Sequence, residues 1–396
     1  MFCYLFYYTG RQNFGFAIPG IQSELGLSKE AIGWISGVLL WSYAIGQAIN
    51  GNLGDKYGGR RMMALGAFFS CILNWFVSLS SGLMSLLIPW GANGYAQSMG
   101  WAPGSRIISN WWKHEDRGRA FGFYVFASGM SSVLTYATSI LVIDELGLDW
   151  RWLFRLPVLL MLVGAIVFYF VVRERPDDLG FPSEGREDDT VSNPPTTAET
   201  SLDRYRAVFS NWRFLVASLA IGFQNAARYG LLIWVPVHFL GDNFKDHPGG
   251  KWISLALPVG MALGALSNGW LSDVFFQSRR SGVISLFMAL AAVACGTMYV
   301  LPQDDRWLGI AVLFLCGFFA YGPQAAFWAL CPDLLGTTRA ATGVGIMNMF
   351  AYLVAGFAEP LLGRTIESYN NDTTVIFPFV AGACCISAVL ALIVRR

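Results

Sequence analysis

Charge is scarce in this sequence. Of its 396 residues, 13% are Asp, Glu, Lys or Arg, whereas 55% are hydrophobic. Soluble domains carry roughly 25% charged residues, so too little polar surface remains to cover a water-soluble protein of this length. The net charge of +1 provides no basic face for nucleic acid. The composition excludes a nucleic-acid partner and favours a chain embedded in a lipid bilayer.

Residues for metal binding or covalent catalysis are also sparse. The seven cysteines lie in apolar stretches without a Cys-x-x-Cys pair, and the three histidines are scattered. We interpret the cysteines as reduced packing residues. No spaced nucleophile–base pair, phosphate-cradling glycine loop or cleavable signal peptide stands out. We therefore expect no enzyme activity, no cofactor and no metal.

Long apolar runs dominate instead. A bilayer core about 30 Å thick requires about 20 apolar residues per helix. The 43 glycines suit close helix packing in lipid. The sequence predicts an all-α membrane protein with 12 transmembrane helices. They are expected at 1–24, 32–53, 61–80, 83–110, 119–143, 152–172, 212–240, 251–272, 281–301, 306–331, 339–363 and 373–394.

Basic residues cluster in alternate connections. Lys56, Arg60 and Arg61 follow the second run, and Arg279 and Arg280 follow the eighth. The connections between these are poorer in Lys and Arg and carry acids instead. Because Lys and Arg stay on the cytoplasmic side, we expect both termini in the cytoplasm.

One long polar segment, 173–211, is acidic and rich in Pro and Thr at its centre. Such composition is typical of a flexible linker. It divides the chain into a six-helix bundle over 1–172 and a second over 212–396. We expect the linker to be cytoplasmic.

The two halves repeat. A Gly-x-Leu-x-Asp segment ends at Asp55 and recurs 218 residues later, at Asp273. Arg11 and Arg228, in the first and seventh runs, are 217 residues apart. A shared offset predicts two pseudo-symmetric parallel repeats.

Arg11 and Arg228 are the most informative residues. An arginine at the bilayer centre costs about 2.5–3.5 kcal/mol on insertion scales, so a partner must compensate it. Its planar fork of donors matches phosphate or carboxylate, and two pseudo-symmetric forks would converge on one central cavity. The alternative is that each arginine pairs with an acid and only joins helices. Glu359 is the main candidate for that acid.

Glu359 has two interpretations. In the first, it is a functional carboxylate that either couples transport to protons or pairs with an arginine when the site is empty. In the second, it is a hydrated residue near the outer mouth, beside Pro360. At the cytoplasmic ends, Asp55 can pair with Arg117, or with a helix terminus, across the cytoplasmic seam. We predict that Asp55, Arg60, Arg117 and Asp273 act in gating; simple anchoring by positive charge is the alternative.

A family resemblance follows from these segments. The stretch Gly-x-Leu-x-Asp-Lys-x-Gly-Gly-Arg-Arg at 51–61 is similar to the signature loop of the major facilitator superfamily. The segments around Tyr8-Thr-Gly-Arg11, Gly100-Trp-Ala-Pro, Arg228-Tyr-Gly and Tyr321-Gly-Pro resemble the organophosphate:phosphate antiporters. That group includes bacterial glycerol-3-phosphate and hexose-phosphate carriers.

The resemblance implies a substrate site at mid-membrane, between two halves that rock against each other. It implies that Arg11 and Arg228 clamp a phosphoryl group, and that Tyr8, Tyr43, Tyr321 and Tyr352 line the pocket. It also implies a monomer in a bacterial inner membrane.

Three positions depart from that family. Gln12 and Gln47 stand where its carriers commonly have lysine, and Asn110 stands in place of a histidine. We retain all three as candidate substrate contacts. With less positive charge, the site is expected to take a cargo that is less anionic, bulkier, or bound through amides.

The predicted function is exchange of a phosphate ester for inorganic phosphate. The alternatives are a proton- or sodium-coupled carboxylate symporter and a transport-fold sensor of sugar phosphates.

Overall fold

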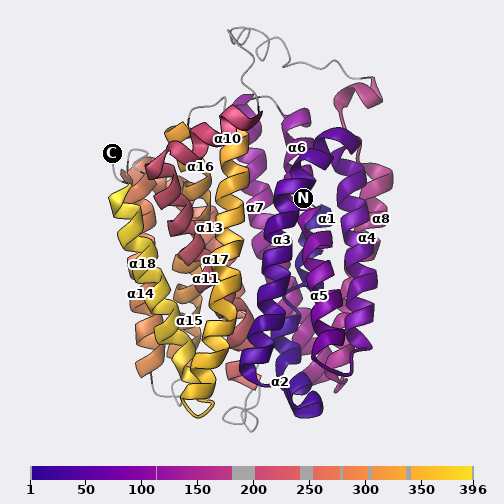
Figure 1. The fold of residues 1–396 in the computed structure, drawn as a ribbon, viewed down its shortest axis with the longest axis vertical. Coiled ribbons are helices and arrows are strands. Elements are labelled where there is room, and N and C mark those ends of the chain that lie inside the picture. The colour runs from indigo at the N-terminus through magenta and orange to yellow at the C-terminus, as the bar shows by residue number, and fades with distance from the viewer. Residues whose placement is uncertain are drawn as a thin grey trace.

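The protein is a bundle of helices arranged as two groups side by side (Figure 1). This computed structural model describes residues 2–112, 114–180, 201–240, 253–276, 280–301, 306–335 and 340–394. Over those ranges the secondary structure is helical, with turns and short 3-10 or π segments, and contains no strand. The predicted all-α fold is confirmed.

The first group, indigo to magenta in Figure 1, begins with an interrupted helix. Its elements are α1 (Phe2–Leu5), η1 (Tyr7–Gly10), α2 (Phe14–Leu25), α3 (Lys29–Tyr57), α4 (Gly59–Ser78), α5 (Leu83–Ser98), α6 (Trp101–Trp111), α7 (His114–Ile140), η2 (Leu141–Glu145), η3 (Trp150–Phe154) and α8 (Pro157–Val171). A short turn, η4 (Pro176–Leu179), follows α8.

The second group, pink through orange to yellow, repeats the plan. Its elements are α10 (Ser201–Ser210), α11 (Trp212–Leu240), α13 (Ala256–Phe276), α14 (Arg280–Val300), α15 (Arg306–Tyr321), α16 (Gln324–Leu335), α17 (Ala340–Ser368), η7 (Thr373–Val375) and α18 (Ile376–Ile393). Together the described elements cover all the predicted spans.

Within the described ranges, eight candidate spans are long and apolar enough to cross a bilayer by length and composition. The predicted spans at 1–24, 83–110, 212–240 and 251–272 are not among them. Two of these are broken helices: the first is interrupted between Tyr7 and Asn13, and α5 gives way to α6 at Met99 and Gly100. The spans of Arg11 and Arg228, 1–24 and 212–240, are among these less apolar ones.

The break between α15 and α16 is the counterpart of the α5–α6 break in the second half. Pro323 stands just before α16 and has no N–H to donate, so the ladder of hydrogen bonds stops there. At Gly100, the ring of Tyr7 occupies the place where a Cβ would stand. The α5–α6 break at Gly100 and the α15–α16 break at Pro323 therefore lie at matching places in the two halves.

The halves meet along α3 and α17, which lie side by side in Figure 1. A Cβ on Gly33 would come within 2.5 Å of the Glu359 carbonyl oxygen, and one on Gly37 within 2.6 Å of the Gly356 carbonyl oxygen. Small residues allow such backbone contact between membrane helices. At the same end, Lys29 Nζ donates to the Asn371 carbonyl at 3.2 Å.

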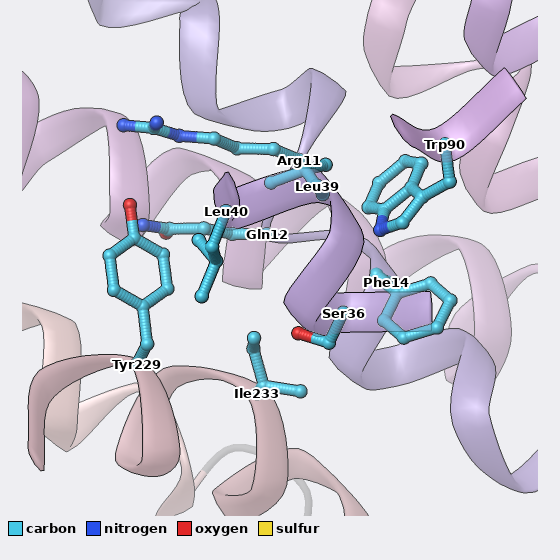
Figure 2. Close-up of a pocket in the computed structure, with 9 residues that line it drawn as sticks. All are labelled: Arg11, Gln12, Phe14, Ser36, Leu39, Leu40, Trp90, Tyr229 and Ile233. Atoms are coloured by element: carbon cyan, nitrogen blue, oxygen red, sulfur yellow. The ribbon is translucent and has the colours of Figure 1, made fainter. Parts of the chain in front are cut away.

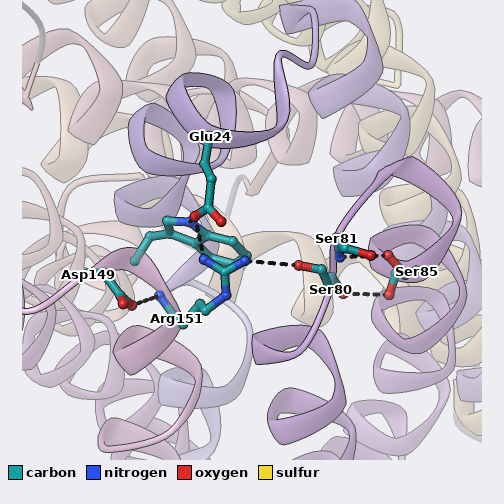
Figure 3. A network of polar contacts seen from close by, with 7 residues as sticks. Glu24, Ser80, Ser81, Ser85, Asp149 and Arg151 are labelled. Carbon is teal, nitrogen blue, oxygen red and sulfur yellow. Dashed lines mark hydrogen bonds and ion pairs between the residues drawn. The ribbon is translucent and has the colours of Figure 1, made fainter.

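A polar network ties together the connections of the first half at this end (Figure 3). Arg151 forms an ion pair with Glu24, at the end of α2, and its Nη2 donates to the Ser80 carbonyl at 3.2 Å. Glu24 is half exposed. Exposed pairs of this kind are worth about 0–1 kcal/mol, so the network positions the loops more than it stabilises the bundle.

Candidate functional site

The interruption of the first helix places Arg11. Between Tyr7 and Asn13 the backbone leaves the regular helix, which frees carbonyl groups from their usual partners. Asn74 Nδ2 and Asn93 Nδ2 donate to the Gly10 carbonyl at 3.0 and 2.7 Å, and Gln97 Nε2 donates to the Tyr7 carbonyl at 3.0 Å. These buried amides from α4 and α5 satisfy the freed groups. We call Asn74, Asn93 and Gln97 the amide web.

The guanidinium of Arg11 is buried and stacked on aromatic rings. The side chain is 3% exposed. Its Cζ lies 4.0 Å from the centroid of Tyr8 and 4.9 Å from that of Tyr43. None of its three nitrogens has a hydrogen-bond acceptor. Cation–π contact offsets part of the burial cost but leaves five N–H donors available.

Arg228 approaches from the middle of α11. It is 2% exposed, and its Nη2 donates to the Tyr8 hydroxyl oxygen at 3.1 Å. Its Cζ lies 4.2 Å from the Tyr321 centroid. The Nε has no acceptor. Tyr8 therefore contacts both guanidinium groups. Its ring contacts Arg11, and both its ring and its hydroxyl contact Arg228.

No acid neutralises this pair within the described part of the chain. The ion pair found there joins Arg151 to Glu24, and neither residue lines a hollow beside Arg11 or Arg228. Among the described residues, therefore, neither Arg11 nor Arg228 forms the ion pair with an acidic side chain that the alternative requires. Two buried positive charges, one from each half, are available to an anion.

Two hollows flank the arginines. The first is narrow, with a cavity volume of about 10 Å³, and is lined by Arg11, Gln12, Ser36 and Tyr229 together with apolar side chains. Figure 2 shows Arg11 and Gln12 extending side by side toward the wall that carries Tyr229. Neither amide atom of Gln12 has a hydrogen-bond partner. The second hollow has a cavity volume of about 20 Å³ and includes Arg228.

The other predicted pocket tyrosines come together here. The rings of Tyr43 and Tyr352 lie 4.3 Å apart between centroids, across the two halves. The Tyr321 hydroxyl is 2.9 Å from Ser128 Oγ on α7. Tyr8, Tyr43, Tyr321 and Tyr352 all line the second hollow.

Two predicted contacts lie elsewhere. Gln47 is buried, and its Nε2 donates to the Ser98 carbonyl at 3.2 Å. Asn110 stands at the end of α6, and its Nδ2 donates to the Glu174 carbonyl at 3.1 Å. Neither residue lines a hollow. Both amides donate to backbone carbonyl groups, at Ser98 on α5 and at Glu174 shortly after α8.

Glu359 does not occupy a hydrated mouth. It is 1% exposed on α17, and its Oε2 accepts a hydrogen bond from Trp234 Nε1 at 2.8 Å. Its Oε1 has no partner. The carboxyl group is thus enclosed in the seam between α3, α11 and α17.

The predicted gating residues are only partly described. Arg60 donates from Nη1 to the Val172 carbonyl at 3.3 Å, and its Cζ lies 4.9 Å from the Tyr169 centroid. It therefore joins α4 to the end of α8 within one half. The side chains of Asp55, Arg117 and Asp273 lie outside the described residues.

Sequence reasoning missed the amide web and Tyr229. Three buried amides on two apolar helices are themselves a signal, because polar groups inside a membrane require partners. Tyr229 follows Arg228 directly and lines the first hollow, and its hydroxyl lies 3.4 Å from that of Tyr352.

Residues 1–359 match the family model of the Major Facilitator Superfamily. The chain belongs to this superfamily. It is an integral, multi-pass membrane transport protein and not an enzyme.

Curated relatives sharpen the family assignment. A probable hexose phosphate transport protein of Chlamydia pneumoniae is 26% identical, covering 93% of this chain and 84% of that protein. The glycerol-3-phosphate transporter of Bacillus subtilis is 27% identical, with coverage of 93% and 84%. The membrane sensor protein UhpC of Escherichia coli is 24% identical, with coverage of 98% and 88%. The predicted resemblance to the organophosphate:phosphate antiporter family is confirmed.

A solved structure shares the fold. The bacterial homologue of the human lysosomal transporter Spinster, in an inward-facing and unoccupied conformation, superposes with a TM-score of 0.75 at 15% identity, covering 99% of this chain and 93% of that one.

Proposed function

We propose that this protein exchanges a phosphate ester for inorganic phosphate across a bacterial inner membrane. The observation that carries the proposal is the pair Arg11 and Arg228: buried, drawn from opposite halves, sharing Tyr8, and without an acid partner in the described residues. Phosphate at neutral pH carries about −1.5 to −2 as an ester and offers oxygens that suit a guanidinium fork. The names of the Chlamydia and Bacillus relatives support the same cargo.

The exchange mechanism follows from electrostatics. Two unneutralised guanidinium groups are costly in a low-dielectric cavity, and a bound phosphate offsets that cost. The loaded halves can then rock together around the site, whereas the empty site crosses poorly. Exchange is the result, because each passage requires an anion in the site. The rocking bodies are 1–172 and 212–396, joined by 173–211.

We further propose that the carrier is a monomer with both termini in the cytoplasm. The alternation of basic connections supports this orientation. On this assignment, the α3–α17 glycine contact lies toward the outside. The gate of Asp55, Arg117 and Asp273 then faces the cytoplasm.

The test uses proteoliposomes preloaded with labelled phosphate. External phosphate or a phosphate ester should drive efflux, and omitting the external anion should stop it. Arg11→Lys and Arg228→Lys should each lose exchange although net charge is kept, because the bidentate fork is lost. Arg151→Lys, at the exposed network of Figure 3, is the matched control and should exchange normally. Normal exchange by either site variant would refute the clamp.

A second candidate function is proton-coupled uptake of an organic carboxylate. The observation that favours it is the buried Glu359, which accepts a hydrogen bond from Trp234 through Oε2 and whose Oε1 has no partner. A carboxyl group in such a place is a candidate proton carrier. An imposed pH gradient should then drive uptake into vesicles that contain no counter-anion. Uptake that requires internal phosphate instead would leave exchange as the function.

A sensor role is the third possibility, supported by the E. coli sensor relative. It predicts binding of sugar phosphate with no exchange at all in proteoliposomes.

A further inference from the structure

Pro236 removes a backbone donor from the helix that carries Arg228. It lies inside α11, which continues on both sides of it. In an α-helix the N–H of each residue bonds to the carbonyl four residues earlier, so Pro236 leaves the Leu232 carbonyl without its helical partner. Leu232 lies one turn beyond Arg228 and is fully buried. A buried carbonyl left unpaired is costly, so this oxygen requires a donor from elsewhere.

The donor comes from the opposite half of the molecule. The Tyr136 hydroxyl, on α7, donates to the Leu232 carbonyl at 2.7 Å. Tyr136 is fully buried, and its ring packs edge-on against Phe16 on α2, with centroids 4.9 Å apart. The first half therefore holds the ring, and the hydroxyl reaches across to α11. This single bond joins the two halves at the turn that follows Arg228.

The same region brings two proline-containing segments together. A proline follows each site arginine by eight residues, at Pro19 in α2 and at Pro236 in α11. The two helices touch here through backbone, because a Cβ on Gly15 would come within 2.6 Å of the Ile233 carbonyl oxygen. In the proposed orientation, these segments form the outer ends of the first and seventh spans. The Tyr136 bond is therefore made while those outer ends are together.

We propose that Tyr136 is a positioning residue, which fixes the turn after Arg228 against the first half and favours the state that is closed to the outside. When the outer ends part, water can replace the hydroxyl at the Leu232 carbonyl. Without the hydroxyl, closure would expel that water and leave the carbonyl unpaired in a dry seam. Pro236 thus makes closure depend on a group in the opposite half. This inference rests on the proposed rocking of the two halves, and not on which anion they carry.

The test measures the separation of the outer ends in the purified protein in lipid nanodiscs, without any cargo. Spin labels are attached at Ser81→Cys and Ser368→Cys, two exposed positions, in a Cys385→Ser background that lacks the exposed native thiol. Electron paramagnetic resonance then reports a short separation for the closed state and a long one for the open state. Tyr136→Phe keeps the ring and should raise the ratio of open to closed molecules at least about fivefold.

Pro236→Ala supplies a readout that a merely structural role of Tyr136 would not change. The N–H gained at position 236 can bond to the Leu232 carbonyl within α11, so the carbonyl no longer depends on the hydroxyl. In the Pro236→Ala background, Tyr136→Phe should therefore change the ratio less than about twofold. The matched control is Tyr124→Phe on the same helix, because the Tyr124 hydroxyl donates to the Gly100 carbonyl at 3.0 Å within the first half. It should lower the thermal midpoint and leave the ratio unchanged.

Three results would overturn the inference: an unchanged ratio in Tyr136→Phe, the same shift in Tyr124→Phe, or an equal effect of Tyr136→Phe in both backgrounds. The thermal midpoint of each variant establishes that it is folded. If Tyr136→Phe folds only in the Pro236→Ala background, that rescue supports the same bond, whereas unfolding in both backgrounds refutes it. The labels report without phosphate, so a failure of phosphate exchange leaves this result standing, and a failure here leaves the arginine clamp untouched.

Discussion

The two halves hold their arginines in different ways. In the first half the helix itself opens, and Arg11 projects from the interruption that the amide web supports. In the second half α11 stays regular from Trp212 to Leu240, and Arg228 projects from an intact turn. Arg11 has no bonded nitrogen, whereas Arg228 is bound to Tyr8. The two repeats thus differ at equivalent positions: the guanidinium of Arg11 has no hydrogen-bond acceptor, whereas that of Arg228 is oriented by its bond to Tyr8.

This difference assigns separate tasks. A fork with every N–H available can take two oxygens of a phosphate at once. A fork that already donates to Tyr8 has fewer donors left, but its direction is fixed, so less rotamer entropy is lost on binding. We expect Arg11 to supply more of the affinity and Arg228 more of the geometry.

The largest loss of exchange is expected on substitution of the two arginines, and the loss should be greater for Arg11 than for Arg228. Arg11→Lys should reduce exchange by more than about 100-fold, because two charge-assisted bonds of about 1.5–3 kcal/mol each are disturbed. Arg228→Lys should reduce it by about 10- to 100-fold, since one of its bonds goes to Tyr8. Initial rates of phosphate exchange at several concentrations measure both. Equal losses, or a greater loss in Arg228→Lys, would show that the free nitrogens of Arg11 are not what binds.

The amide web provides the next test. Asn93→Leu removes a donor from the Gly10 carbonyl and leaves Ser70, which donates to Asn93 Oδ1, without its acceptor. We expect a lower thermal midpoint and about tenfold weaker apparent phosphate affinity, because the interruption that aims Arg11 loosens. The matched variant is Gln224→Leu in the second half, where Nε2 donates to the Ala320 carbonyl at 2.7 Å. It should lower stability alone, and a similar loss of affinity there would remove the contrast between the halves.

Tyr8→Phe should have a smaller effect. It keeps the ring under Arg11 and removes the acceptor for Arg228. Phosphate affinity should fall about three- to tenfold in binding measurements by calorimetry, the value of one ordinary hydrogen bond of about 0.5–1.5 kcal/mol, because this bond orients Arg228 and does not itself contact phosphate. If Arg228→Lys is then made in the Tyr8→Phe background, the two losses should not add, because they share one contact.

Glu359→Gln distinguishes exchange from proton coupling. The amide oxygen can still accept from Trp234, so the fold should persist. If the protein is an exchanger, Glu359→Gln should keep phosphate exchange within about twofold of wild type, because no substrate contact changes. A proton-coupled carrier should instead lose uptake driven by a pH gradient, which the same vesicles can report.

The smallest effect belongs to the outer network. Glu24→Gln removes the ion pair with Arg151 while leaving the shape of the side chain. We expect a change in stability below about 1 kcal/mol and normal exchange. A large loss in thermal midpoint would mean that these loops, rather than the amide web, hold the first half together.

Much of this architecture could be read from the sequence. Arg11 and Arg228 stood out because charge is rare in apolar spans, and the family segments around them placed Tyr8, Tyr43, Tyr321 and Tyr352. The interruption at Tyr7–Asn13 was not foreseen, because the run around it is nearly apolar and the amides that stabilise it lie 60 to 90 residues away. The hydrogen bonds of Asn110 and Gln47 could not be predicted for a similar reason: their backbone partners, at Glu174 and Ser98, cannot be identified from residue type alone.

The glycine contact between α3 and α17 has a mechanical consequence. Surfaces formed by bare backbone have no interlocking side chains, so they can part and close again without any rotamer having to change. A single methyl group at Gly33 or Gly37 would clash with the backbone of α17 and keep α3 and α17 from closing together. Such a variant should be held open on that side, fully folded and yet unable to complete its cycle.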